Sequence, residues 1–148
     1  MFFLFTVVII LNYKLTLLNT MIYLFLLGRI LLGGYFIKNS FNHFLNLSSV
    51  AGYAASKNTP WPKLAVTVTG LILLLGGLGI LLGVYIDYAV LLLSVFLIGV
   101  TFKMHQYWKE SEPMQRMAEN INFYKNLALL GAILIMLFIP EPWEMSLF

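Results

Sequence analysis

The amino-acid sequence predicts an all-α protein, a membrane-embedded antiparallel four-helix bundle. The first reason is composition: 61% of the 148 residues are hydrophobic and only 10% are charged, against about 45–50% and about 25% in soluble domains. The second reason is pattern, because apolar runs of a length that can cross a bilayer recur along the chain. A chain this short leaves much of its surface exposed. We therefore expect lipid to surround it and place it in a cell membrane as a multi-pass protein.

Four apolar runs define the expected spans, and together they make a transmembrane domain over residues 21–139, followed by a short tail at 140–148. The spans cover about 21–44, 64–84, 89–104 and 121–139. A very short turn at Tyr85–Tyr88 joins the second and third spans, which makes them antiparallel neighbours. The polar stretch 109–120, KESEPMQRMAEN, is expected to be a solvated loop. In the first loop, AGYAAS is either a short interfacial helix or a capped turn.

Residues 1–20 form an apolar extension ahead of the first span. They lack the pattern of a secretory signal, which needs positive charge before its apolar core. Two interpretations remain open. The extension either continues the first helix beyond or along the bilayer surface, or it precedes a natural start at Met21.

The positive charges predict the orientation in the membrane. Seven Lys and Arg residues fall on the side of the first and third loops, and only Lys14 falls on the other. The seven are Lys38, Lys57, Lys63, Lys103, Lys109, Arg116 and Lys125. Since cytoplasmic loops hold the excess of positive charge, we expect the first and third loops in the cytoplasm and the C-terminus outside.

Composition also excludes several kinds of chemistry. The chain has no cysteine, so disulfides, thiolate metal sites and thiolate-held iron–sulfur clusters are ruled out. A net charge of +3, scattered along the chain, does not suggest nucleic-acid binding. Two histidines with no cysteine and no nearby carboxylate form an incomplete ligand set, so no metal site is expected. The predicted spans contain no Asp or Glu, which argues against a proton pump.

The first span carries an unusual charge, Arg29. At helical spacing, Arg29, Gly33, Phe36, Ser40 and His43 share one stripe, which we expect to face the bundle interior. A charge within a membrane segment is expensive. Arg29 is therefore either a ligand-binding residue or a structural residue bonded to backbone carbonyls.

The antiparallel arrangement predicts that polar residues gather at one end of the bundle. The candidate ligand-binding residues are Arg29, Lys38, Asn42, His43, His105 and Asn126, with Thr101, His105 and Trp108 as a matching stripe on the third span. Such a cavity suits an anionic or carbonyl-bearing ligand such as a quinone headgroup, because Arg supplies fixed charge and His exchanges protons near neutral pH. The alternative for His43 and His105 is anchoring at the membrane interface. Gly33, Gly76, Gly77 and Gly83 are expected to allow close helix packing.

Four sequence stretches in register resemble the DoxX family of small membrane proteins. They are GRILLGGYFIKNSFNHF, YAASKNTPWPKLAVTVTG leading into GGLGILLG, FKMHQYW, and NFYKNLALLGAILI. The matching residues are Arg29, Gly33, Phe36, Lys38, Pro60, Gly76, Gly77, Gly83, His105, Trp108, Asn126 and Gly131. The resemblance implies a four-helix membrane bundle associated with redox chemistry, since the related DoxD-type protein is a subunit of a thiosulfate:quinone oxidoreductase. Family members often have an acidic residue where this chain has Leu73, which would leave Arg29 without a carboxylate partner.

From these observations we expect an accessory or quinone-interacting subunit of a membrane redox system. A quinone is then the candidate ligand, and a redox enzyme or a second copy of the chain is the candidate partner. A non-catalytic scaffold or assembly factor is the alternative. A small-molecule carrier is disfavoured, because the sequence shows no obvious inverted repeat.

Overall fold

The computed structural model describes residues 2–147, with side chains for residues 12–147, and it is helical throughout its regular elements. The helices are α1 (Phe2–Leu45), α2 (Leu47–Ser56), α3 (Pro62–Leu82), α4 (Ile86–Met104), η1 (Tyr107–Lys109), α5 (Pro113–Ile135) and η2 (Met136–Phe138). Four of the described helices are long and apolar enough to cross a membrane. The predicted all-α membrane fold is confirmed.

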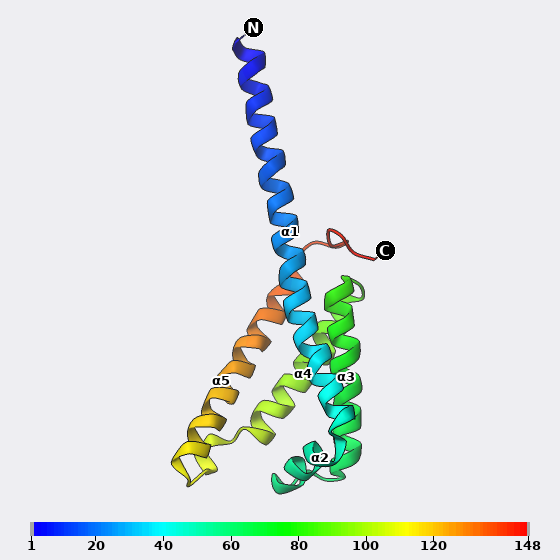
Figure 1. The fold of residues 1–148 in the computed structure, drawn as a ribbon, viewed down its shortest axis with the longest axis vertical. Helices are drawn as coiled ribbons and strands as arrows, with labels where there is room; N and C mark the ends of the chain where they lie inside the picture. The colour runs from blue at the N-terminus through cyan, green and yellow to red at the C-terminus, as the bar shows by residue number, and fades with distance from the viewer. Residues whose placement is uncertain (1, 148) are drawn as a thin grey trace.

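Helix α3 is central to the bundle, since it packs against α1, α2 and α4, while α5 packs mainly against α4 (Figure 1). Helix α1 runs without a break from Phe2 to Leu45. Its first half projects beyond the other helices (Figure 1), so the described part of the predicted extension continues the first helix. The stretch AGYAAS lies in α2, which settles the choice between helix and turn.

Glycines on two faces of α3 bring its neighbours close. A Cβ atom on Gly33 of α1 would lie 2.7 Å from the carbonyl oxygen of Gly77. On another face of α3, a Cβ atom on Gly76 would lie 2.5 Å from Leu93 of α4. Because such distances exclude any side chain, α1 and α4 can approach α3 this closely only at glycine.

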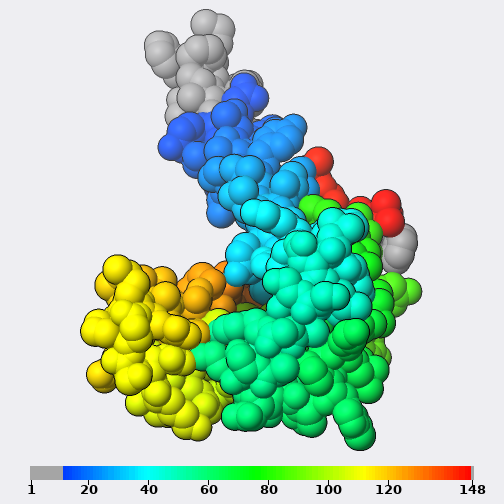
Figure 2. Space-filling model, turned by 60° about the horizontal axis from the view of Figure 1, so that its bottom comes forward, coloured from blue at the N-terminus to red at the C-terminus, as the bar shows by residue number. Residues whose placement is uncertain are grey.

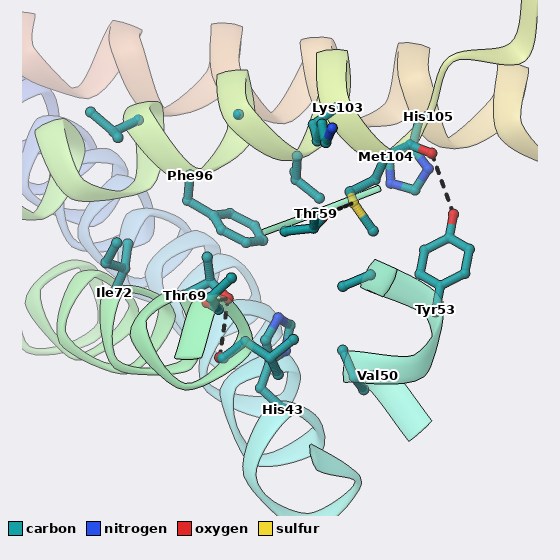
Figure 3. Close-up of a pocket in the computed structure, with 16 residues that line it drawn as sticks. His43, Val50, Tyr53, Thr59, Thr69, Ile72, Phe96, Lys103, Met104 and His105 are labelled. Atoms are coloured by element: carbon teal, nitrogen blue, oxygen red, sulfur yellow. Dashed lines mark hydrogen bonds between the residues drawn. The ribbon is translucent and has the colours of Figure 1, made fainter. Parts of the chain in front are cut away.

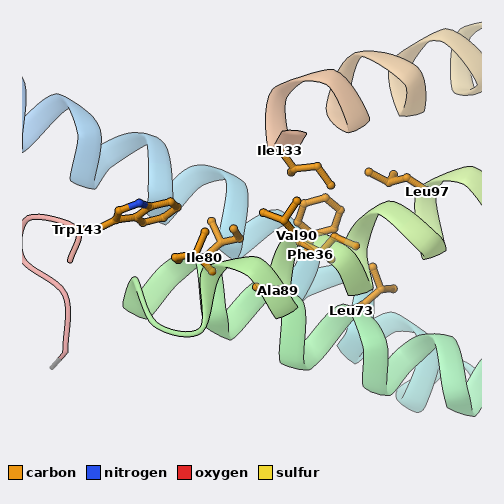
Figure 4. Packing of buried hydrophobic residues seen from close by; sticks show 10 residues of the cluster. Phe36, Leu73, Ile80, Ala89, Val90, Leu97, Ile133 and Trp143 are labelled. Carbon is orange, nitrogen blue, oxygen red and sulfur yellow. The ribbon is translucent and has the colours of Figure 1, made fainter. Parts of the chain in front are cut away.

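The apolar core lies between α1, α3, α4 and α5, with Phe36 and Val90 near its middle, Trp143 at one end and Leu73 toward the other (Figure 4). On α1 the side chains of Arg29, Phe36 and Ser40 are at most 1% exposed. The Ser40 hydroxyl donates to the backbone oxygen of Gly70, 2.8 Å away. The predicted inward stripe of the first span is therefore confirmed.

Arg29 joins three parts of the chain at the end of the bundle opposite to α2. Its Nε donates to the backbone oxygen of Ile80 (3.2 Å), its Nη2 to that of Leu81 (2.9 Å) and its Nη1 to that of Glu144 (2.8 Å). Carbonyl groups in the last turn of a helix lack a hydrogen-bond donor within the helix. In α3, Arg29 is the donor for two such carbonyls, those of Ile80 and Leu81. Its guanidinium also lies 5.6 Å from the centre of the Trp143 ring.

Gly83 makes room for this arrangement where α3 ends. Its φ of 72° is left-handed, a conformation that glycine adopts without steric cost. A Cβ atom at this position would lie 2.5 Å from Nη2 of Arg29. The end of α3 and the guanidinium therefore fit together only around a glycine.

The expected solvated loop over residues 109–120 is wrong in its second part. Helix α5 begins at Pro113, and the carboxylate of Glu112 accepts a hydrogen bond from the backbone N–H of Gln115 at 2.6 Å. Proline at the first helical position and an acceptor just before it start a helix.

The stripe of the third span is also shorter than expected, because α4 ends at Met104 and Trp108 lies in η1.

Replacing Arg29 should destabilise the bundle without altering the other end. In Arg29→Ala, buried carbonyls of α3 lose their donor, and each unsatisfied acceptor costs about 1–3 kcal/mol, so we expect a loss of about 3 kcal/mol. Arg29→Lys should restore only part of it, because an ammonium group cannot span three separate acceptors. Thermal unfolding in detergent measures the effect, with the exposed Lys38→Ala as control. A wild-type melting temperature for Arg29→Ala would contradict the structural role.

Candidate functional site

A small polar cavity lies between α1, α4 and α5. Its volume is about 170 Å³. It is lined by Tyr35, Phe36, Asn39, His43, Leu73, Phe96, Leu97, Val100, His105, Asn122, Lys125 and Asn126. Three of the predicted ligand-binding residues meet here: His43 of α1, His105, which caps the C-terminal end of α4, and Asn126 of α5. We refer to this space as the polar cavity.

Asn126 is a polar side chain of this cavity that makes no hydrogen bond in the described part of the chain. The residue is 6% exposed, and its amide makes no hydrogen bond to the described residues. Its polar neighbours are engaged: Asn39 donates to the backbone oxygen of Tyr35 at 2.7 Å, and Lys125 donates to Asn122 at 2.7 Å. The unbonded amide atoms keep some accessible surface, so the Asn126 side chain is available to a ligand.

His43 lines the cavity and keeps one ring nitrogen without a hydrogen bond to the described residues. Its Nδ1 lies 2.9 Å from the backbone oxygen of Asn39. A carbonyl only accepts hydrogen bonds, so Nδ1 carries the proton and Nε2 of the neutral ring is left with a lone pair. The ring also stacks edge-on against Phe96, with 6.3 Å between the ring centres.

His105 is oriented in the same way, but by a carboxylate. Its Nδ1 lies 2.6 Å from Oε2 of Glu119. The carboxylate fixes the tautomer in which Nε2 is free, and it stabilises the imidazolium when Nε2 takes up a proton. This arrangement can accept a proton from a bound hydroxyl group or return it.

Glu119 belongs to a buried network that ties α2 to α5. Its Oε1 accepts hydrogen bonds from the hydroxyl of Tyr53 at 2.8 Å and from Nζ of Lys57 at 3.1 Å. Lys57 also pairs with Glu110. The Glu119 side chain is only 6% exposed, so its charge is balanced by hydrogen-bonded partners rather than by water.

The network shifts the pKa values of Tyr53, which lies in α2, and of Lys57, which caps the C-terminal end of α2. Burial raises the pKa of Tyr53 well above its usual value, and the hydrogen bond to Glu119 adds to the effect. Burial alone would lower the pKa of Lys57, but its bonds to Glu110 and Glu119 outweigh burial and raise it. At neutral pH, Tyr53 is therefore a neutral donor and Lys57 a cation.

A second, apolar cavity lies beneath α2 and borders α1, α3 and α4 (Figure 3). Its volume is about 310 Å³. It is lined by His43, Val50, Tyr53, Ala54, Thr59, Ala65, Val66, Thr69, Ile72, Val95, Phe96, Gly99, Val100, Lys103, Met104 and His105. Both cavities share His43, Phe96, Val100 and His105. We refer to this space as the apolar cavity.

The two cavities occupy the α2 end of the bundle. In Figure 2 this end is turned forward, and the surface is hollowed between the start of α5, in yellow, and the green segment of α2 and α3. The walls come from helices that are far apart in the sequence but packed together in pairs.

The other predicted site residues lie outside both cavities. Lys38 is exposed, and Asn42 is exposed and accepts a hydrogen bond from Asn46 at 2.8 Å. Arg29 is at the opposite end, with its guanidinium bonded to backbone oxygens. The structure therefore brings together three of the six predicted residues.

Sequence reasoning missed the carboxylate of this site. The expected loop over residues 109–120 includes Glu119, so the sequence predicts spans without a carboxylate and histidines without an acidic neighbour; both expectations are wrong. A helix beginning at Pro113 would have placed Glu119, Phe123 and Asn126 on one face, at steps of four and three.

Within the described part of the chain, no group of three His, Asp or Glu side chains could hold a metal ion.

Removing the Glu119 carboxylate should release α2. In Glu119→Ala the half-buried His105 loses its carboxylate and Lys57 keeps only Glu110, which costs about 2 kcal/mol, the value of a hydrogen bond to a charged group. We expect faster tryptic cleavage after Lys57 and a lower melting temperature. Glu144→Ala, which removes an exposed carboxylate, should leave both unchanged. Equal cleavage rates for Glu119→Ala and the wild type would show that the network does not hold α2.

Comparison with known proteins gives one match. A protein-family model, DoxX, matches residues 24–106, which is more than half of the chain. No curated protein and no solved structure matches it. The matched region contains α2 and α3 and runs from within α1 to the C-terminal cap of α4, so it includes both histidines of the cavities. The chain therefore belongs to the DoxX family of membrane proteins.

Proposed function

We propose that this DoxX protein binds the headgroup of a quinone in the polar cavity and acts as an accessory subunit of a membrane redox system. The observation that carries the proposal is the Asn126 amide, which makes no hydrogen bond to the described residues and lies in a cavity that it shares with His43 and His105. These groups supply a hydrogen-bond donor and two acceptors, all uncharged when the histidines are neutral.

The size and chemistry of the cavity support a ring with oxygen substituents. A cavity of about 150 Å³ accepts a benzene ring, and the polar cavity has about 170 Å³. The Asn126 amide can donate to a quinone carbonyl. The free Nε2 atoms of His43 and His105 can accept from the hydroxyl groups of the reduced form.

The proposal assigns proton exchange to this chain and electron transfer to a partner. His105 can hold a proton at Nε2 while Glu119 balances the charge at 2.6 Å. The sequence has no cysteine to hold an iron–sulfur cluster. A redox enzyme in the same membrane would therefore supply or remove the electrons of the quinone.

Quinone binding to the purified protein tests the proposal. We expect a tailless quinone to raise the melting temperature of the wild type. Asn126→Leu, which keeps the volume but removes the amide, should weaken binding roughly tenfold, the value of about one hydrogen bond. His105→Ala should weaken it similarly.

Lys38→Ala is the matched control, because Lys38 lies on α1 near the same end but lines neither cavity. It should bind the quinone as the wild type does. If the wild type shows no binding, or if Asn126→Leu and Lys38→Ala bind equally well, the quinone does not occupy the polar cavity.

A further inference from the structure

We infer that the apolar cavity beneath α2 is the binding site for the isoprenoid tail of the same quinone. This inference rests on the proposed function. The polar cavity has about 170 Å³, enough for a ring but not for a ring and its chain. The chain must therefore leave the polar cavity, and the apolar cavity adjoins it through the shared residues His43, Phe96, Val100 and His105.

The lining of the apolar cavity offers hydrocarbon surface, because its hydroxyl groups are already engaged. The Thr69 hydroxyl donates to the backbone oxygen of Ala65 at 2.8 Å. The Tyr53 hydroxyl donates to Glu119 at 2.8 Å, and the Thr59 hydroxyl contacts the sulfur of Met104 at 3.8 Å. An occupant gains packing here but few hydrogen bonds, which suits an aliphatic chain.

The cavity opens at an apolar mouth on α4. Gly99 is exposed, and Val95 is 57% exposed. A mouth of this composition faces lipid, so a chain can enter sideways from the bilayer. The volume of the apolar cavity is about 310 Å³, which is about twice the volume of a cavity that binds a benzene ring. It therefore holds on the order of ten to twelve carbon atoms, about two isoprene units.

The wall that the two cavities share carries hydrogen-bonding atoms that suit a quinone ring. His43 and His105 line both cavities, and each ring is held through Nδ1, so Nε2 can bond to a ring oxygen. Lys103 of the apolar cavity donates to the backbone oxygen of Asn58 at 3.0 Å and keeps its positive charge. A phospholipid is therefore the competing occupant that the test separates from the quinone.

The roof of the cavity is held in place, so the site exists before the ligand arrives. Ala51 and Ala54 of α2 pack against Val66 of α3. The bonds of Tyr53 and Lys57 to Glu119 fix α2 from its other side. A preformed cavity avoids the ordering cost that a flexible one would impose on binding.

Filling the mouth tests the inference. A Cβ atom on Gly99 meets no atom within 4 Å, so Gly99→Phe can place a ring at the cavity without distorting α4. Gly131 of α5 also has no atom within 4 Å of a Cβ, but it lines neither cavity, so Gly131→Phe is the matched control. The probes are a tailless naphthoquinone and the same ring with two isoprene units. The tail partitions into detergent equally for all variants, so differences between variants report on the protein.

We expect Gly99→Phe to weaken binding of the prenylated quinone roughly tenfold, the scale of a lost apolar contact in a pocket. Its affinity for the tailless ring should stay unchanged, and Gly131→Phe should bind both probes as the wild type does. Equal affinity of the wild type and Gly99→Phe for the prenylated quinone would overturn the inference alone. Absence of binding of either probe to the wild type would overturn the proposed function as well. A phospholipid that co-purifies with the wild type but not with Gly99→Phe in native mass spectrometry would assign the cavity to a lipid chain instead.

Discussion

The bundle depends on the satisfaction of polar groups that lipid cannot solvate, and Arg29 is where this constraint is most severe. The end of a helix presents carbonyls that need donors, and a guanidinium needs acceptors when it leaves water. Arg29 meets both needs by donating to Ile80 and Leu81 of α3 and to Glu144 of the tail. One side chain therefore fixes the register of α1 against α3, and this register aligns Gly33 with Gly77 and carries His43 to the cavities at the other end.

The inward stripe of α1 and the meeting of His43, His105 and Asn126 could be predicted from the sequence, because helical spacing and antiparallel order determine both. The partners of Arg29 could not be predicted, since they are backbone oxygens and one of them belongs to a tail with no regular structure. Glu119 was missed because the stretch around it is strongly polar. The charge of Glu119 is compensated by Lys57, which is distant in the sequence, and compensation of this kind leaves no local pattern.

The two histidines show how a polar site can exist among apolar helices. Each ring is held through Nδ1, His43 by a carbonyl of its own helix and His105 by a carboxylate of α5. Both Nε2 atoms are then free, but only His105 has a neighbouring negative charge. The two rings therefore differ in what holds them, a carbonyl for His43 and a carboxylate for His105, and the Phe96 ring packs against His43 where the two cavities meet.

The bond between Arg29 and Glu144 also has a consequence for biosynthesis. The two residues are 115 positions apart in the chain. When α1 first enters the bilayer from a ribosome, α3 and the tail have not yet been made, so the guanidinium has none of its final acceptors. The acceptors in α3 become available when that helix has been made, and the acceptor at Glu144 follows only after α5. The docking of α1 around Arg29 is therefore completed only when the segment that contains Glu144 has been made.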